Sequence, residues 1–112
     1  MGRMQRRKGA AYERWVAKMF RSVLPGTEVK RGLQSRSGEE CPDVTAGLFW
    51  VECKHGKLPN VRAALAQAVD DCPKGRIPIA VIRDNRSIDF CVLRFSDFLE
   101  VIKEWSDLCE RC

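Results

Sequence analysis

The sequence predicts one α/β domain in which a mixed five-stranded sheet is flanked by helices. Its length of 112 residues is typical of a single domain. Hydrophobic residues make up 45% and charged residues 31%, which is ordinary for a globular protein. Apolar residues recur with helical spacing in three segments, and strand-like apolar runs lie in five others. The predicted order is α-β-β-β-α-β-β-α, which favours helices packed around one sheet.

The first helix is predicted from an apolar stripe that ends before Pro25 and Gly26. The stripe recurs at i, i+3, i+4, i+7, i+8 and i+11 through Tyr12, Trp15, Val16, Met19, Phe20 and Val23. Residues 1–8 precede the stripe, and we expect them to form a basic N-terminal arm. A strand is expected at residues 27–33, and the polar segment 34–42, which contains Gly and Pro, is expected to be a loop.

Residues 43–54 predict two strands joined by a tight turn at Gly47 and Leu48, because a type II′ turn favours glycine at its first central position. The resulting register pairs, outward from the turn, Ala46 with Phe49, Thr45 with Trp50, Val44 with Val51, and Asp43 with Glu52. Directly opposed residues point to the same face, and so do residues two apart in one strand. We therefore expect Asp43, Glu52 and Lys54 to lie together on one face of the sheet.

A second helix is expected after Pro59, which suits a first helical turn. Its predicted buried stripe is Val61, Ala64, Leu65, Ala68 and Cys72. Residues 77–83 form an apolar run that predicts a buried strand, and residues 88–95 predict another. Ser96 is a candidate N-cap for a final helix, whose apolar side is predicted to consist of Phe98, Leu99, Ile102 and Trp105.

The excess positive charge lies in the first half of the chain. Residues 1–60 hold 12 basic and 6 acidic side chains, whereas residues 61–112 hold 8 basic and 9 acidic ones. This asymmetry indicates either a polyanionic partner such as nucleic acid or a solvated basic face without a partner. No apolar run approaches the ~18 residues that cross a membrane, and no apolar segment typical of a secretory signal follows the basic N-terminus. We therefore expect an intracellular protein without a membrane partner.

Two carboxylates and a lysine on one sheet face need compensation, because like charges held close together are costly. A Mg²⁺ ion provides it, since it binds one or two carboxylates together with waters and substrate phosphate. The candidate protein ligands are Asp43, Glu52 and the backbone carbonyl of Cys53. Lys54 is then placed to stabilise charge on a phosphodiester that the metal polarises. The alternative for Lys54 is a salt bridge without catalytic meaning.

Pro42-Asp43 followed by Glu52-Cys53-Lys54 resembles the signature of the PD-(D/E)xK nuclease superfamily. The resemblance covers most of the chain and implies a restriction-endonuclease-like core with Mg²⁺ as cofactor and Mn²⁺ as its substitute. It also implies that Glu13, on the first helix, completes the metal site and that Gln67, on the second helix, joins the catalytic residues. A solvated helix glutamate and a plain surface glutamine are the alternatives for these two residues.

Within that superfamily the chain is most similar to archaeal-type Holliday-junction resolvases. The likeness rests on Lys8-Gly9-Ala10 before Glu13 and on a Ser-Gly loop ahead of Asp43. It implies a catalytic role for Ser37, with Ser35 as second candidate, whereas an ordinary turn is the alternative. The hairpin is shorter than in those enzymes, and Glu39 and Glu40 add negative charge to the loop.

The resemblance implies a Mg²⁺-dependent, structure-selective DNA endonuclease that hydrolyses phosphodiesters at four-way junctions as a homodimer. A second copy supplies a second active site, and two sites related by symmetry suit paired cuts in a branched duplex. The alternatives are a related repair, nicking or restriction-like nuclease, and a non-catalytic nucleic-acid-binding module. The expected contacts to the phosphates of branched or duplex DNA are Arg3, Arg6, Arg7, Lys8, Lys30, Arg31, Arg36 and Lys57.

Overall fold

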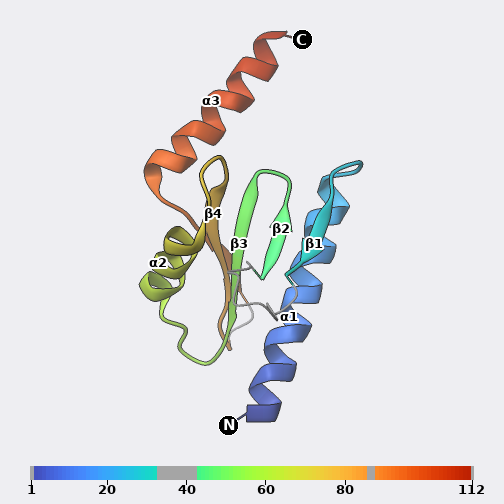
Figure 1. Ribbon diagram of the computed structural model, residues 1–112, viewed down its shortest axis with the longest axis vertical. Coiled ribbons are helices and arrows are strands. Elements are labelled where there is room, and N and C mark those ends of the chain that lie inside the picture. The colour runs from blue at the N-terminus through green and yellow to red at the C-terminus, as the bar shows by residue number, and fades with distance from the viewer. Residues whose placement is uncertain (1, 33–42, 86–87, 112) are drawn as a thin grey trace.

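The computed structural model describes residues 2–32, 43–85 and 88–111, which build three helices and one five-stranded sheet (Figure 1). The order of elements follows the sequence prediction. The elements are α1 (Gly2–Val23), β1 (Val29–Arg31), β2 (Val44–Ala46), β3 (Phe49–His55), α2 (Val61–Asp71), β4 (Ile77–Arg83), β5 (Asp89–Val92) and α3 (Phe95–Arg111).

The sheet has the order β1-β2-β3-β4-β5 and is mixed, as predicted. Neighbouring strands are antiparallel except β3 and β4, which are parallel. The connection through α2 carries the chain back to the edge of the sheet at which β3 begins, so β4 runs in the same direction as β3. The predicted β2–β3 register is confirmed for Ala46 with Phe49, Thr45 with Trp50, and Val44 with Val51. Gly47 has φ +56, a conformation that favours glycine, so the turn forms where the sequence places it.

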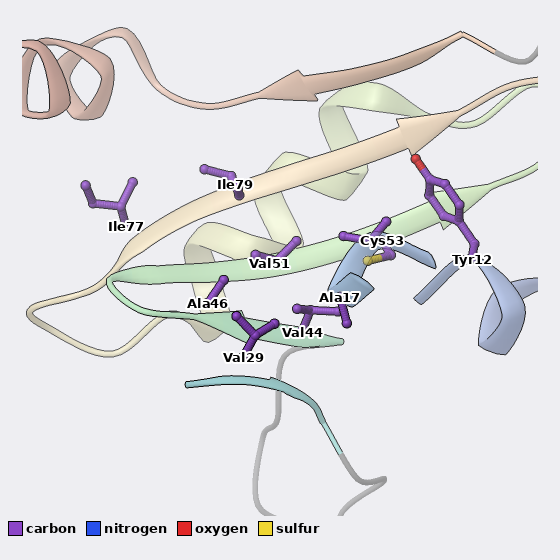
Figure 2. Close-up of a cluster of buried hydrophobic side chains, with 10 residues drawn as sticks. Tyr12, Ala17, Val29, Val44, Ala46, Val51, Cys53, Ile77 and Ile79 are labelled. Atoms are coloured by element: carbon purple, nitrogen blue, oxygen red, sulfur yellow. The ribbon is translucent and has the colours of Figure 1, made fainter. Parts of the chain in front are cut away.

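Helices cover both faces of the sheet. From α1, Tyr12, Val16 and Ala17 are buried against the side chains of β1–β4 that point to their face (Figure 2). On the opposite face, α2 is capped by Asn60, whose side chain accepts from the Ala63 N–H. The buried side of α2 consists of Ala64 and Ala68, small residues that let the helix approach β4 closely.

The alternation along β3 places its charged residues and its core residues on different faces. Val51 and Cys53 belong to the core beneath α1. Glu52 and Lys54 therefore point to the opposite face, which α2 covers. The predicted grouping of Glu52 and Lys54 on one face follows directly from this alternation.

A polar and aromatic cluster fixes α1 to strands β4 and β5. The Tyr12 hydroxyl donates to Asp89 Oδ1 at 2.9 Å. Arg83 donates to the same carboxylate through Nε at 2.8 Å, and its guanidinium lies 4.4 Å from the centre of the Trp15 ring. These contacts hold the α1 turn that carries Glu13 in a defined position relative to β4 and β5.

The boundaries of several elements differ from the prediction. Residues 2–8 are the first turns of α1 rather than an arm, because the segment is rich in Arg, Gln and Met, which favour helix. Strand β1 is shorter than the expected 27–33. Strand β5 ends at Val92, and Ser96 lies inside α3 instead of capping it. The carbonyl of Arg94 accepts the first helical bond, from the Phe98 N–H at 3.0 Å, so the helix begins one residue before Ser96.

The last helix, α3, projects away from the sheet at the end opposite to the start of α1 (Figure 1). Within the described residues, no helix is both long enough and apolar enough to cross a membrane. The cysteines in this part of the chain, Cys53, Cys72, Cys91 and Cys109, are free thiols.

Candidate functional site

The β2–β3 hairpin places Asp43 beside Glu52. Asp43 directly precedes β2, and its Oδ2 accepts from the backbone N–H of Cys53 at 2.8 Å. The backbone carbonyl of Asp43 accepts from the Gly32 N–H, also at 2.8 Å, so the residue is held between β1 and β3. The β2–β3 register ends at the Val44–Val51 pair, and the charge of Asp43, one residue before it, acts on the carboxyl of Glu52, one residue after it.

Glu52 is the one charged residue that is buried among those the structure describes, with 3% of its surface exposed. Burial, followed by repulsion from Asp43, raises the pKa of the Glu52 carboxyl from 4.5 to about 7, while Lys54 acts in the opposite direction. A buried carboxylate is costly without a compensating positive charge. The ionised form of Glu52 is therefore destabilised at this position.

The Asp43 carboxyl is perturbed in the same direction. Burial raises its pKa from 3.8 to about 6, against the Cys53 N–H, which stabilises the ionised form. The Glu13 carboxyl raises the pKa of Asp43 as well, through its charge and a side-chain hydrogen bond, and Lys54 lowers it. Glu13, Asp43, Glu52 and Lys54 thus act on one another although they come from three separate parts of the chain.

Glu13 is held by an ion pair. Arg31 of β1 donates through an Nη atom to Glu13 Oε1 at 3.2 Å, with both side chains partly buried. The Arg31 Nε atom is buried and has no hydrogen-bond partner in the described part of the chain. Arg31 thus offers unsatisfied hydrogen-bonding capacity directly beside the carboxylates.

The two halves of Cys53 have different surroundings. Its thiol is buried in the core beneath α1, and burial raises the pKa of that thiol. Its N–H points to Asp43. Because the N–H and C=O of one strand residue point to the same side, the carbonyl is directed to that side as well. The backbone of Cys53, rather than its side chain, belongs to the site.

A divalent cation with oxygen ligands fits this donor set. Mg²⁺ binds one or two carboxylates and keeps several waters, which matches Asp43, Glu52 and the Cys53 carbonyl. Among the described residues, no three His, Cys, Asp or Glu side chains are arranged as a metal-binding group. The fit therefore rests on two carboxylates and a backbone oxygen, together with the raised pKa values of both acids.

Other predicted site residues are placed differently. Gln67 is exposed on α2, and its side chain is not among the groups that shift the pKa of Asp43 or Glu52. Ser37 and its alternative Ser35 lie outside the described residues, and Arg36 lies outside them too. The structure thus brings together Glu13, Asp43, Glu52 and Lys54 but does not add Gln67 to them.

The predicted phosphate contacts fall into three groups. The backbone of Arg3, Arg6, Arg7 and Lys8 lies in the first turns of α1, which extend past the sheet (Figure 1), and their side chains are outside the described part. On β1, Lys30 forms an exposed ion pair with Glu28 at 2.7 Å, and Arg31 is bound to Glu13. Lys57 is exposed in the segment that follows β3.

Two features of the site were not predicted from the sequence. Asp71, at the end of α2, adds to the negative potential that raises the pKa of Glu52. His55 packs against Tyr12 with 5.2 Å between the ring centres, on the α1 face and away from Lys54. No spacing signal marks either one, because both depend on how a helix lies over the sheet.

Comparisons with known proteins give no identification: no family model matches the chain, and no curated protein is significantly similar to it in sequence.

Proposed function

We propose that the chain is a metal-dependent endodeoxyribonuclease with a restriction-endonuclease-like core, related to the PD-(D/E)xK nucleases. The observation that carries the proposal is the pair of carboxyls Asp43 and Glu52, which act on each other at the end of the hairpin, have raised pKa values and are followed by Lys54. A protein that only bound DNA would gain nothing from buried carboxylates, because they repel phosphate. Carboxylates at this place are useful where a cation is bound.

In the proposed mechanism Asp43, Glu52 and the Cys53 carbonyl hold Mg²⁺ or Mn²⁺. With such an ion bound, the site would gain Lewis-acid polarisation of the scissile phosphate and a lowered pKa for the attacking water. The hydrogen bond from the Cys53 N–H favours the ionised form of Asp43 against the effect of burial and orients its carboxylate. Lys54 supplies a positive charge for the phosphate oxygens as negative charge develops on them.

Glu13 and Arg31 set the charge balance beside this site. Arg31 offsets part of the Glu13 charge through their ion pair, although Glu13 still raises the pKa values of Asp43 and Glu52. The basic turns of α1, with β1 and Lys57, then provide sequence-independent contacts to DNA phosphates. Such contacts supply affinity that falls as salt concentration rises.

Four-way DNA junctions are the proposed substrate. This choice rests on the resemblance at Lys8-Gly9-Ala10 and Glu13 to archaeal-type junction resolvases, and it places the enzyme inside a prokaryotic, archaeal or phage-infected cell, where such DNA forms. The experiment is incubation with Mg²⁺ and end-labelled four-way junction, linear duplex and single strand of matched sequence. Paired, symmetric nicks confined to the junction are expected.

The controls separate the substrate from the chemistry. Cutting of linear duplex at the same rate would reject junction selectivity and retain the nuclease. Lys54→Ala is expected to lower the cutting rate at least ~100-fold, in the range seen when one charge-stabilising group is removed. Lys103→Ala, an exposed lysine on α3, is the matched control and should cut normally. Full activity of Lys54→Ala, or no cutting of any substrate by the unmodified protein with Mg²⁺ or Mn²⁺, would contradict the proposal.

A further inference from the structure

The apolar side of α3 has no counterpart within the described chain. None of the described α3 side chains is buried, yet the helix carries a continuous apolar stripe at helical spacing. Trp105 is 65% exposed and Leu108 58% exposed. The other large apolar side chains exposed on α3 are Phe95, Phe98, Leu99 and Ile102. The helix projects away from the sheet (Figure 1), so the apolar stripe on its outer half is not covered by the core of the same chain.

An apolar groove of about 550 Å³ lies at the base of α3. It runs along the second half of α1, over the face of β4 and β5, to the first turns of α3. Met19, Phe20 and Val23 form its α1 wall, and Leu93 and Phe98 close the other side. Ser22 and Asp89 are the polar residues in a lining that is otherwise apolar. Such a groove suits the apolar face of a helix.

We propose that the occupant of this groove is a second copy of the chain, with the outer half of α3 of each copy packed into the groove of the other. The groove and the projecting stripe are on the same molecule, so a two-fold axis pairs each with its complement. The helix has 17 residues and is therefore about 26 Å long, so its outer turns extend beyond its own groove.

Charge complementarity favours this occupant. Outside its apolar stripe α3 carries five acidic and two basic residues. The described part of α1 beside the groove carries three basic residues, Arg14, Lys18 and Arg21, and one acidic residue, Glu13. An acidic helix therefore lies against a basic one when α3 enters the partner's groove, whereas two α3 helices packed together would repel each other. The same acidic face disfavours DNA or an anionic membrane as the occupant.

The exposed apolar area agrees with the size of a stable dimer interface. With roughly 200 Å² for each large side chain, the exposed fractions of the six α3 residues, Met19 and Val23 amount to about 900 Å² per copy. Standard interfaces bury about 800 Å² per partner, and monomers rarely expose apolar patches of more than a few hundred Å². A reciprocal exchange of α3 covers most of this surface at once.

The test is the molar mass of the purified full chain, measured by light scattering after size exclusion over a range of concentrations. The unmodified protein is expected to be a dimer. Trp105→Glu alters the helix, and Met19→Glu alters the groove; each is expected to weaken the dimer roughly 30-fold or more, as for a central interface residue. Leu58→Glu, at a side chain that is 90% exposed in the segment after β3, introduces the same charge elsewhere and should leave the mass unchanged.

Mixing the two variants distinguishes helix exchange from other dimers. A Trp105→Glu chain keeps its groove, and a Met19→Glu chain keeps its helix, so a mixed dimer retains one intact contact of two. Native mass spectrometry should then show the mixed dimer in excess over either variant dimer. A monomeric unmodified protein, a dimer unaffected by either variant, or a mixture without preference for the mixed dimer would overturn the proposal. Far-UV circular dichroism of each variant shows that it is folded, and the readout is independent of nuclease activity.

Discussion

Replacing Glu52 by glutamine is expected to stabilise the metal-free protein at neutral and alkaline pH. Glutamine has nearly the same shape as glutamate but no charge, so it keeps the packing beneath α2. The buried Glu52 carboxyl has its pKa raised from 4.5 to about 7. One pKa unit corresponds to about 1.4 kcal/mol, so the rise is worth roughly 3–4 kcal/mol of destabilisation when the carboxyl is fully ionised, most of which develops between pH 5 and pH 8.

The sign and the pH window follow from the direction of the shift. Between about pH 4.5 and 7 the folded protein binds a proton at Glu52 that the unfolded chain has lost. The free energy of unfolding of the unmodified protein therefore falls through this window and levels off above it. Asp43, with its pKa raised to about 6, adds a decline in the same direction. Glu52→Gln removes the part of this decline that Glu52 causes. The difference in free energy of unfolding between the variant and the unmodified protein therefore grows from pH 5 to pH 8.

The assay is urea unfolding in EDTA, followed by far-UV circular dichroism at pH 5, 6, 7 and 8. Glu52→Gln should gain roughly 2–3 kcal/mol relative to the unmodified protein between pH 5 and pH 8. Glu28 directly precedes β1 and has an exposed carboxyl, so Glu28→Gln should show no such pH-dependent gain in free energy of unfolding. An equal effect of Glu52→Gln at pH 5 and pH 8 would refute the claim that this carboxylate is ionised at a cost.

Three further predictions concern the metal, the turn and the α1 anchor. At pH 8, millimolar Mg²⁺ or Mn²⁺ should raise the melting temperature of the unmodified protein but not of Asp43→Asn, because a ligand that binds the folded state stabilises it; equal shifts in both proteins would place the cation elsewhere. Gly47→Ala should lower the free energy of unfolding by about 1 kcal/mol or more, since φ is +56 and the new Cβ would lie 3.2 Å from Thr27 Cγ2; an unchanged urea midpoint would contradict this. Tyr12→Phe should cost about 1–2 kcal/mol through loss of the 2.9 Å hydrogen bond to Asp89, and a thermal melt identical to that of the unmodified protein would show that the bond does not anchor α1.

The core of the candidate site could be predicted from the sequence because it depends on local geometry. A two-residue turn at Gly47 fixes the register of β2 and β3, and the register fixes which residues face each other. The period of two along β3 then places Glu52 and Lys54 on one face. These relations span a dozen residues and involve no packing between distant parts of the chain.

Contacts between distant elements could not be predicted in the same way. The Arg31–Glu13 ion pair joins α1 to β1, and the effect of Asp71 on Glu52 depends on how α2 lies over the sheet. Gln67 has the right helix but an exposed position on it. The angular position of a residue on a helix is set by which face packs, and for α2 that face consists of Ala64 and Ala68.

Element ends were the other source of error. The predicted arm at residues 1–8 is helical because its residues favour helix and nothing in it interrupts α1. Ser96 looked like an N-cap, but Arg94 occupies that place, and its guanidinium binds Asp97 in the first turn at 2.8 Å. A single good capping residue does not determine a boundary, because helix ends shift by one or two residues with the backbone hydrogen bonds that form.

The most direct test of the central claim is single-turnover cleavage of a labelled four-way junction by the unmodified protein and by Asp43→Asn, with junction binding measured on the same samples in Ca²⁺ or EDTA. Metal-dependent cutting by the unmodified protein, at least ~100-fold slower cutting by Asp43→Asn, and equal binding by both are predicted, because Asp43 is assigned to the metal and not to the DNA. Equal cutting rates for the two proteins, or tight binding without any cutting by either, would contradict the account.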